Sequence, residues 1–227
     1  MADGVVILGA GAGGKFAKEI LEAEGKAVAG YLDNFVERGC EVVGAPVLGG
    51  WELLENPEFV ARHGFLVTIG QMHARIDACA LVRSRGGKLV NAIHPMAVVS
   101  SYATIGEGVL INATAHVLPD AVIGNNVLIE GHCSVGVDCV IEDHVLFGTG
   151  VQINGASRIR RGTFMGACSV VIPKVTVGEG CYVGAGAVVC KDLTAGKLAV
   201  GVPARVIKDS PWPWRQGAVA GEGQDGC

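Results

Sequence analysis

A glycine-rich turn near the start of the chain is the first segment whose residues could bind a ligand. Gly9, Gly11, Gly13 and Gly14 follow a short apolar run and precede a segment with helical character. Backbone N–H groups in such a turn, at the N-terminus of a helix, can bind a phosphate. The spacing is GxGxG and not GxGxxG, so it does not imply a dinucleotide. The turn predicts a phosphate-bearing ligand, and the alternative is a tight turn without one.

Three further residues are expected at the same edge of a sheet. Asp33 and Asn34 end a second apolar strand, and Gly70 follows a third. The carboxyl ends of parallel strands meet at one edge, where such folds bind a ribose or a base. The substrate contacts predicted there are Gly11, Gly13, Asp33, Asn34 and Gly70.

A pair of aspartates in the second half of the chain could act as a base. Asp120 and Asp138 are 18 residues apart, which is one coil of the repeat described below. Two carboxylates stacked on successive coils can raise one pKa and produce a usable base. The alternative is a solvated pair of turn aspartates. Asp138 is retained as a catalytic candidate.

Histidines are the other candidates for proton transfer. His132 and His144 occupy equivalent corner positions of the repeat, on two different corners. Either could take part in proton transfer, or could be bonded to a neighbouring carbonyl group. A zinc site would need imidazoles that converge. His116, His132 and His144 occupy different positions or corners, and no HxxxxH pair exists, so we expect no metal.

The glycine-rich turn, Asp33, Asn34 and Gly70 belong to a domain predicted over residues 1–92. Apolar runs at residues 5–8, 27–33, 65–69 and 88–92 read as strands. Residues 15–24 and 72–85 read as helices. This alternation predicts a parallel, Rossmann-like α/β sheet.

A hexapeptide repeat begins at Ile93 and continues without insertion to residue 194. Its first position is aliphatic or large and apolar: Ile93, Val99, Ile105, Ile111, Val117, Ile123, Ile129, Val135, Ile141, Phe147, Ile153, Ile159, Met165, Val171, Val177, Val183 and Val189. The fifth position is small or branched. Such a period predicts a left-handed parallel β-helix in which three hexads close one 18-residue coil. We expect residues 195–227 to form a cap, through Gly201 to Arg205, followed by a tail from Trp212.

Composition agrees with this architecture. Half of the 227 residues are hydrophobic, 5% are aromatic and 35 are glycine. Small and β-branched residues must therefore form the core. The formal charge of -4 provides no basic surface for nucleic acid. Without an 18-residue apolar run or a charged leader, the chain is predicted to be cytoplasmic and not membrane-bound. The cysteines at positions 133, 139 and 181 are expected to be packing residues.

Three features together resemble the NeuD-like hexapeptide-repeat sugar acyltransferases. They are the unbroken hexads, the "GVPARVIK" segment after them and the "LGAGAGGKFAKEIL" start. The resemblance extends to about Lys208 and includes acetyltransferases of nucleotide-linked amino sugars, such as the enzyme of the bacillosamine pathway. It implies a homotrimer, a UDP- or GDP-linked sugar bound by the N-terminal domain, and acetyl-CoA between neighbouring β-helices. The CoA positions that it implies are Gly155, Ala167 and Ala185.

The chain departs from this family at three histidine positions. The usual "HDCVIGD" stretch is here "VDCVIED", so Val137 replaces the catalytic histidine and Asp138 keeps the acid. Gly13 and Leu146 occupy the other two positions. We therefore predict N-acetylation of an amino sugar without the usual histidine base. The alternative is a degenerate member that binds a sugar nucleotide, or assembles as a scaffold, without turnover.

Overall fold

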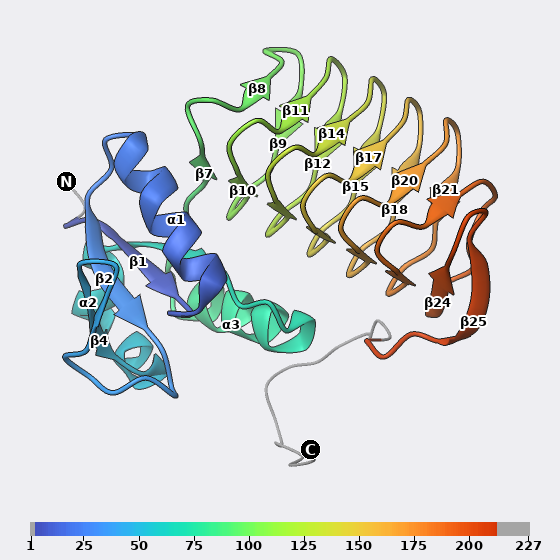
Figure 1. Cartoon of the computed structure of the whole chain (residues 1–227). Helices are drawn as coiled ribbons and strands as arrows, with labels where there is room; N and C mark the ends of the chain where they lie inside the picture. The colour runs from blue at the N-terminus through green and yellow to red at the C-terminus, as the bar shows by residue number, and fades with distance from the viewer. Residues whose placement is uncertain (1–2, 213–227) are drawn as a thin grey trace.

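The computed structural model describes residues 3–212, and its N-terminal part is built around a parallel sheet (Figure 1). The strand order is β3-β4-β2-β1-β5-β6, with only the edge strand β3 antiparallel to its neighbour. The strands are β1 (Val5–Leu8), β2 (Val28–Leu32), β3 (Glu41–Val42), β4 (Ala45–Gly49), β5 (Gly64–Val67) and β6 (Lys88–Leu89). The central strand β1 is buried on both faces, as expected for a parallel sheet covered on both sides.

Helices cover the two faces of this sheet. Val5 and Ile7 of β1 pack in one apolar cluster with α1 (Ala12–Ala23). Val6 and Leu8 pack in a second cluster with α3 (Met72–Ser84), α2 (Pro57–Arg62) and the 3-10 helix η1 (Trp51–Glu55). The elements between residues 41 and 62, namely β3, β4, η1 and α2, were not predicted. Helix α1 begins three residues earlier than the sequence suggested, inside the glycine-rich turn.

The second part is a β-helix with one two-residue strand per hexad. Its three sheets are formed by strands that recur every third hexad. We call them by their first strands. The β7 sheet contains β7 (Ala92–Ile93), β10 (Leu110–Ile111), β13 (Leu128–Ile129), β16 (Leu146–Phe147), β19 (Phe164–Met165) and β22 (Tyr182–Val183). The β8 sheet contains β8 (Val98–Val99), β11 (His116–Val117), β14 (Ser134–Val135), β17 (Gln152–Ile153), β20 (Val170–Val171) and β23 (Val188–Val189). The β9 sheet contains β9 (Thr104–Ile105), β12 (Val122–Ile123), β15 (Val140–Ile141), β18 (Arg158–Ile159) and β21 (Thr176–Val177).

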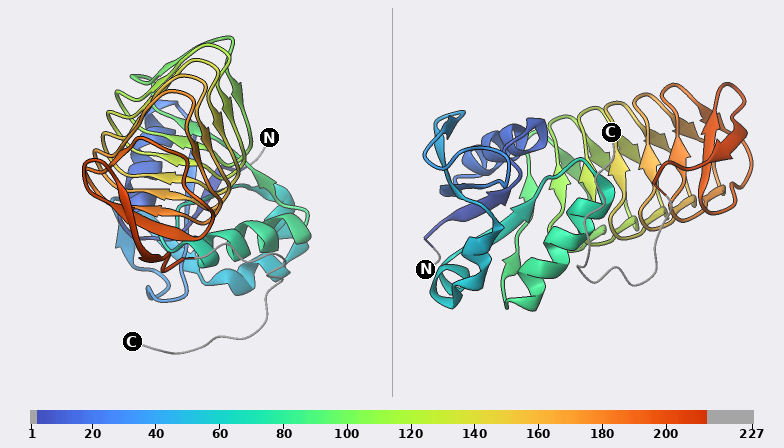
Figure 2. Two further views of the ribbon diagram at one scale, coloured as in Figure 1. Left: turned by 90° about the vertical axis from the view of Figure 1, so that its right-hand side faces the viewer. Right: turned by 90° about the horizontal axis from the view of Figure 1, so that it is seen from below.

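The register confirms the 18-residue coil. Ile111 pairs with Ile129, and Ile129 pairs with Phe147 on the next coil. From Ile111 to Val189, first-position side chains are buried in a single core that runs through the coils. The coils overlie one another along this axis (Figure 2). The three cysteines predicted to pack, at positions 133, 139 and 181, are buried in the same core.

The fourth residue of many hexads turns the corner in the left-handed backbone conformation. His132 has φ 60, Asp138 has φ 58 and His144 has φ 62. Asparagine, aspartate, histidine and glycine tolerate this region better than branched residues do. The corner positions of the two histidines and of Asp138 are therefore set by the requirements of the turn, independently of any catalytic role.

The first and the last coils of the β-helix pack against other elements. Leu110 and Leu128 on the outer face of the first coils pack against Ala17, Ile20 and Leu21 of α1. At the other end, β24 (Lys197–Val200) pairs with β22, and β25 (Arg205–Asp209) folds back antiparallel on β24. The connection accepts a hydrogen bond at Gly201 from the N–H of Val188. Trp212 then packs on the rings of Phe164 and Tyr182, and the rest of the predicted tail lies outside the described residues.

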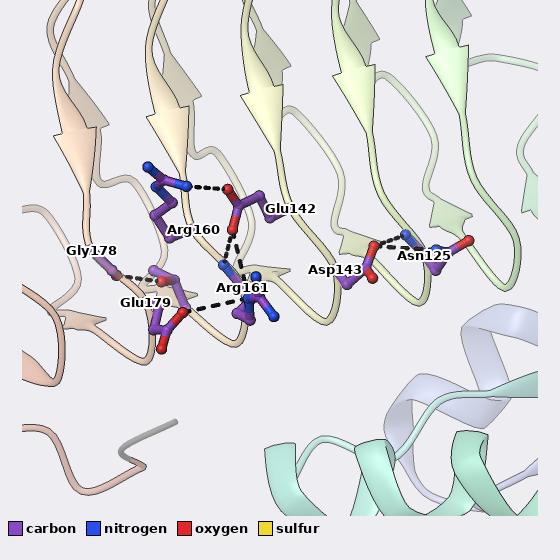
Figure 3. A network of polar contacts seen from close by, with 8 residues as sticks. Asn125, Glu142, Asp143, Arg160, Arg161, Gly178 and Glu179 are labelled. Carbon is purple, nitrogen blue, oxygen red and sulfur yellow. Dashed lines mark hydrogen bonds and ion pairs between the residues drawn. The ribbon is translucent and has the colours of Figure 1, made fainter. Parts of the chain in front are cut away.

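Ion pairs join successive coils at the corner between the β9 and β7 sheets (Figure 3). Glu142 contacts Arg160 at 2.8 Å and accepts from the backbone N–H of Arg161 at 3.1 Å. Asp143 accepts from the backbone of Asn125 at 2.7 Å. These two carboxylates therefore stabilise the stack of coils. Across residues 3–212, no helix is long and apolar enough to cross a membrane.

Candidate active site

A cavity of about 480 Å³ lies where the N-terminal domain meets the β7 sheet of the β-helix. Its walls come from the glycine-rich turn, the ends of β2 and β5, the start of α3, and three residues of the first coils. The lining residues are Gly9, Gly11, Ala12, Gly13, Asp33, Asn34, Phe35, Trp51, Thr68, Ile69, Gly70, Ala74, Leu128, Glu130 and Leu146. All five substrate contacts predicted from the sequence are among them. Their role in binding remains a prediction.

The glycines of the turn serve two different purposes. At Gly13 a Cβ would lie 2.6 Å from the carbonyl oxygen of Thr68, so the close packing of turn on strand requires glycine. At Gly11 and Gly70 a Cβ would meet nothing within 4 Å. These two positions border open space, and their lack of a side chain leaves the backbone accessible from the cavity.

The start of α1 is the positively polarised part of this wall. Its N-cap residue is Gly11, and no side chain caps the helix. By contrast, α3 is capped by the side chain of Gln71, which accepts from the N–H of Ala74 at 2.6 Å. An uncapped helix N-terminus offers backbone N–H groups to an anion. The start of α1 is therefore the better phosphate site of the two.

Asp33 and Asn34, which follow β2, also line the cavity. The carboxylate of Asp33 accepts from the backbone N–H groups of Ala10 and Phe35, both at 2.8 Å. The side-chain oxygen of Asn34 accepts from the N–H of Trp51 at 2.9 Å. Asp33 thus ties the glycine-rich turn to the segment after β2. Phe35, which also lines the cavity, has a side chain that is 98% exposed.

The β-helix contributes one ionisable group, Glu130, to this cavity. Glu130 is partly buried, and its carboxylate accepts from the side-chain amide of Asn112 at 3.2 Å. Burial raises the pKa of the Glu130 carboxyl, and the hydrogen bond from Asn112 offsets part of that rise. Among the described residues it has no cationic partner. Leu128 and Leu146 form the apolar surface beside it.

The three predicted catalytic residues lie apart from one another and outside the cavity lining. His132 is exposed on the corner between the β7 and β8 sheets, and its Nδ1 lies 3.0 Å from the hydroxyl of Thr114. Asp138 is exposed on the next corner, beside Val137, and Asp120 is exposed one coil earlier. His144 lies on the third corner. Within one chain the structure does not bring them together, and their roles remain predictions.

His144 is held beneath α3. Its backbone carbonyl accepts from Nη2 of Arg75 at 2.7 Å, and its Nδ1 lies 2.8 Å from the side-chain nitrogen of Asn126. Burial, together with the positive charge of Arg75, lowers the pKa of His144 to about 4. A base with such a low pKa accepts a proton weakly at neutral pH. This environment favours a structural role for His144.

The predicted CoA positions are small and lie near the surface of the corners. Ala167 and Ala185 are exposed on the corner between the β7 and β8 sheets, on successive coils. Gly155 lies on the following corner, one coil beyond Val137. A single chain therefore presents these positions on two different corners.

Glu130, Arg75 and the aromatic residues Phe35 and Trp51 were not predicted from the sequence. A signal for Glu130 was present, because the second hexad position is often glycine and here carries an acid one coil after Asn112. Arg75 had no such signal, since one arginine in a helix gives no indication of burial. The segment with Phe35 and Trp51 was not assigned to any element.

Comparison with known proteins identifies the family. The sequence model for "Bacterial transferase hexapeptide (six repeats)" matches residues 102–137. A perosamine N-acetyltransferase from Caulobacter crescentus, solved with CoA and GDP-perosamine as a variant in which one histidine is replaced by asparagine, is 36% identical. It superposes with a TM-score of 0.87 over 92% of this chain and 99% of its own.

The chain belongs to the NeuD-like hexapeptide-repeat sugar acyltransferases.

Two other members of this family have the same two-part architecture. The acetyltransferase domain of PglB from Neisseria gonorrhoeae, in complex with acetyl coenzyme A, is 29% identical with a TM-score of 0.84, over 91% of this chain and 100% of its own. WeeI from Acinetobacter baumannii is 25% identical with a TM-score of 0.82, over 89% of this chain and 99% of its own. A shorter match of 53 residues, 43% identical, links the chain to the bifunctional protein GlmU of Rubrobacter xylanophilus. It covers 23% of the chain and only 11% of GlmU.

Proposed function

We infer that this protein transfers an acetyl group from acetyl-CoA to the amino group of a sugar linked to UDP or GDP. The observation that carries the proposal is the cavity itself, which joins an uncapped helix N-terminus to a carboxylate on the β-helix. The relatives support it, because one is an N-acetyltransferase solved with CoA and GDP-perosamine and another contains acetyl coenzyme A.

The lining suggests how a sugar nucleotide would lie. The diphosphate would bind the backbone N–H groups at Gly11 and the start of α1. The nucleoside would extend toward Asn34 and Phe35, whose exposed ring offers a surface for stacking. The sugar would then face the β-helix residues of the lining, which are Leu128, Glu130 and Leu146. Glu130 is the polar residue of these three.

The departures from the family pattern favour an amine as the acceptor. Val137, Gly13 and Leu146 stand where the family's histidines would be. A hydroxyl group needs its proton removed as it attacks, and losing a positioned base costs about 10²–10⁴-fold. An amino group with a pKa near that of an α-amino group, about 8, is partly unprotonated at neutral pH. It can therefore attack the thioester without prior deprotonation by histidine.

Corner geometry supports an active site shared between subunits of a homotrimer. Gly155 and the pair Ala167 and Ala185 are on different corners of one β-helix. They can line one CoA groove only where the corner of one subunit meets a different corner of its neighbour. Sedimentation should therefore show a trimer, and a stable monomer at micromolar concentration would contradict the shared groove.

The proposed activity is tested by thiol release. Purified protein, acetyl-CoA and a panel of UDP- and GDP-linked amino sugars should release free CoA with at least one acceptor. Calorimetry with the same sugar nucleotides measures binding separately. The three replaced histidine positions favour one competing function, a binding protein without turnover. Tight sugar-nucleotide binding with no thiol release across the panel would support that alternative and reject the acyltransferase.

A further inference from the structure

We propose that Glu130 accepts the proton that the acceptor amine loses when it attacks the thioester. This inference rests on the function proposed above. In it, a residue of the β-helix carries out the proton transfer that a histidine performs in the family. It concerns a residue on the corner between the β7 and β8 sheets, away from Val137.

Glu130 lines the cavity between the N-terminal domain and the β-helix. Among the described residues, two ionisable side chains line it, Asp33 and Glu130. Both oxygens of Asp33 already accept backbone N–H groups that fix the turn. Glu130 has one hydrogen bond, to the Asn112 amide, and no cation among the described residues balances its charge. Glu142, the other acid at a second hexad position, is engaged with Arg160 and Arg161.

Glu130 lies on the same corner of the β-helix as two of the predicted CoA positions. Glu130 and Gly131 begin the same corner that carries Ala167 and Ala185 on later coils. Backbone hydrogen bonds connect this corner from coil to coil, from Gly150 to Gly131 at 2.9 Å and from Gly186 to Ala167 at 2.8 Å. At a coil spacing of about 4.8 Å, Ala167 is about 10 Å from the Glu130 coil. A pantetheine arm along this corner would bring its thioester to the cavity.

Space at the carboxylate also supports the assignment. Gly148 follows Glu130 one coil further, so no side chain crowds it from that side. A Cβ at Gly148 would lie 2.8 Å from the nitrogen of Ala167, so the packing of the coils requires glycine there. The coil that leads from Glu130 toward Ala167 therefore leaves room beside the carboxylate.

The groups around Glu130 determine how it titrates. The Cys133 thiol is on its own coil, and its raised pKa reflects burial with a smaller contribution from the Glu130 charge. Asp33 lines the same cavity, α1 carries the ion pair of Lys18 and Glu22, and Arg75 of α3 donates to the carbonyl of His144. Lys18 and Arg75 are already paired or bonded elsewhere. The carboxylate thus remains the group best placed to accept a proton inside the cavity.

The proton balance is simple. The nitrogen lone pair forms the N–C bond, and the nitrogen of the tetrahedral intermediate becomes positively charged and acidic. Glu130 takes that proton, the C–S bond breaks, and the departing sulfur receives a proton from Glu130. The products are the N-acetyl sugar nucleotide and free CoA, with the carboxylate regenerated.

The decisive variant is Glu130→Gln, which keeps the shape and a hydrogen-bonding group but cannot accept the proton. We expect kcat to fall about 100-fold or more while the dissociation constant of the sugar nucleotide stays within about threefold. Glu130→Asp should recover part of kcat. Glu142→Gln is the matched control, since it removes an acid at the same hexad position that is paired with Arg160 and is not among the lining residues, and it should leave kcat unchanged.

Two further readouts separate catalysis from structure. At acidic pH, log kcat of the wild type should fall with slope one as the amine protonates and steepen toward two once Glu130 also protonates. The Gln variant should keep slope one. Because the folded-state pKa of Glu130 is raised, its charge opposes folding at neutral pH. Glu130→Gln should therefore melt no lower than wild type at pH 7.

The outcomes distinguish this inference from the function on which it rests. A Gln variant with wild-type kcat, or one that loses only sugar-nucleotide affinity, would overturn the role of Glu130 while leaving acetyl transfer intact. Wild-type protein that binds the sugar nucleotide and releases no thiol would overturn the proposed function, and the inference with it.

Discussion

Arg75 joins the two parts of the chain, and replacing it should weaken the molecule measurably. Its side chain is 1% exposed, and it donates to the carbonyl of His144 at 2.7 Å and to that of Ile69 at 3.2 Å. Hydrogen bonds from a charged donor contribute about 1.5–3 kcal/mol each, and burial of the guanidinium, which lowers the pKa of Arg75 to about 10, offsets part of that contribution. Arg75→Met keeps much of the volume but loses both bonds. We expect a loss of about 3 kcal/mol in the free energy of unfolding.

Arg83 provides the control on the same helix. It pairs with Glu107 at 3.4 Å on an exposed surface, where such a pair contributes roughly 0–1 kcal/mol. For a chain of this size, about 3 kcal/mol corresponds to a fall in Tm of roughly 6–12 °C. Because Ile69 precedes Gly70 in the cavity wall, Arg75→Met should also weaken sugar-nucleotide binding. Equal melting temperatures for Arg75→Met and Arg83→Met would refute this account.

Three other changes test the account. The pKa of His144 is lowered in the folded state to about 4, below its unfolded value of 6.5. Stability should therefore be lost between pH 6.5 and 4, by at most about 3 kcal/mol, and urea unfolding of His144→Gln should show a smaller loss. Phe147→Ala removes a fully buried ring and should cost about 3–5 kcal/mol in the same measurement. Ala167→Trp should abolish acetyl-CoA binding by calorimetry with an unchanged Tm, and unaltered affinity would reject the proposed groove.

The β-helix could be predicted from the sequence because every hexad must meet the same residue requirements. An apolar first position and a left-handed fourth position recur with a fixed period, so register, sheets and corners follow directly. The glycine-rich turn and the ends of β2 and β5 were predictable for a similar reason, since parallel strands place their carboxyl ends at one edge.

The junction between the two parts could not be predicted in the same way. Periodicity does not say which coil a domain packs against, and so it did not indicate that Glu130 would share a cavity with Gly11. Nor did it reveal that Arg75 is buried beneath the coils. His132, Asp138 and His144 were chosen by residue type, yet they occupy corners where the backbone itself favours such residues.

Mass spectrometry of the product tests directly whether the enzyme is specific for an amine. Wild-type protein is given acetyl-CoA and two forms of one sugar nucleotide, which differ only in an amino or a hydroxyl group at the same carbon. The account predicts a single acetyl group on nitrogen and at least 100-fold slower turnover of the hydroxyl form. Efficient acetylation of the hydroxyl form would contradict this prediction, because removing a hydroxyl proton requires a stronger base than a carboxylate, and the ionisable side chains that line the cavity among the described residues are Asp33 and Glu130.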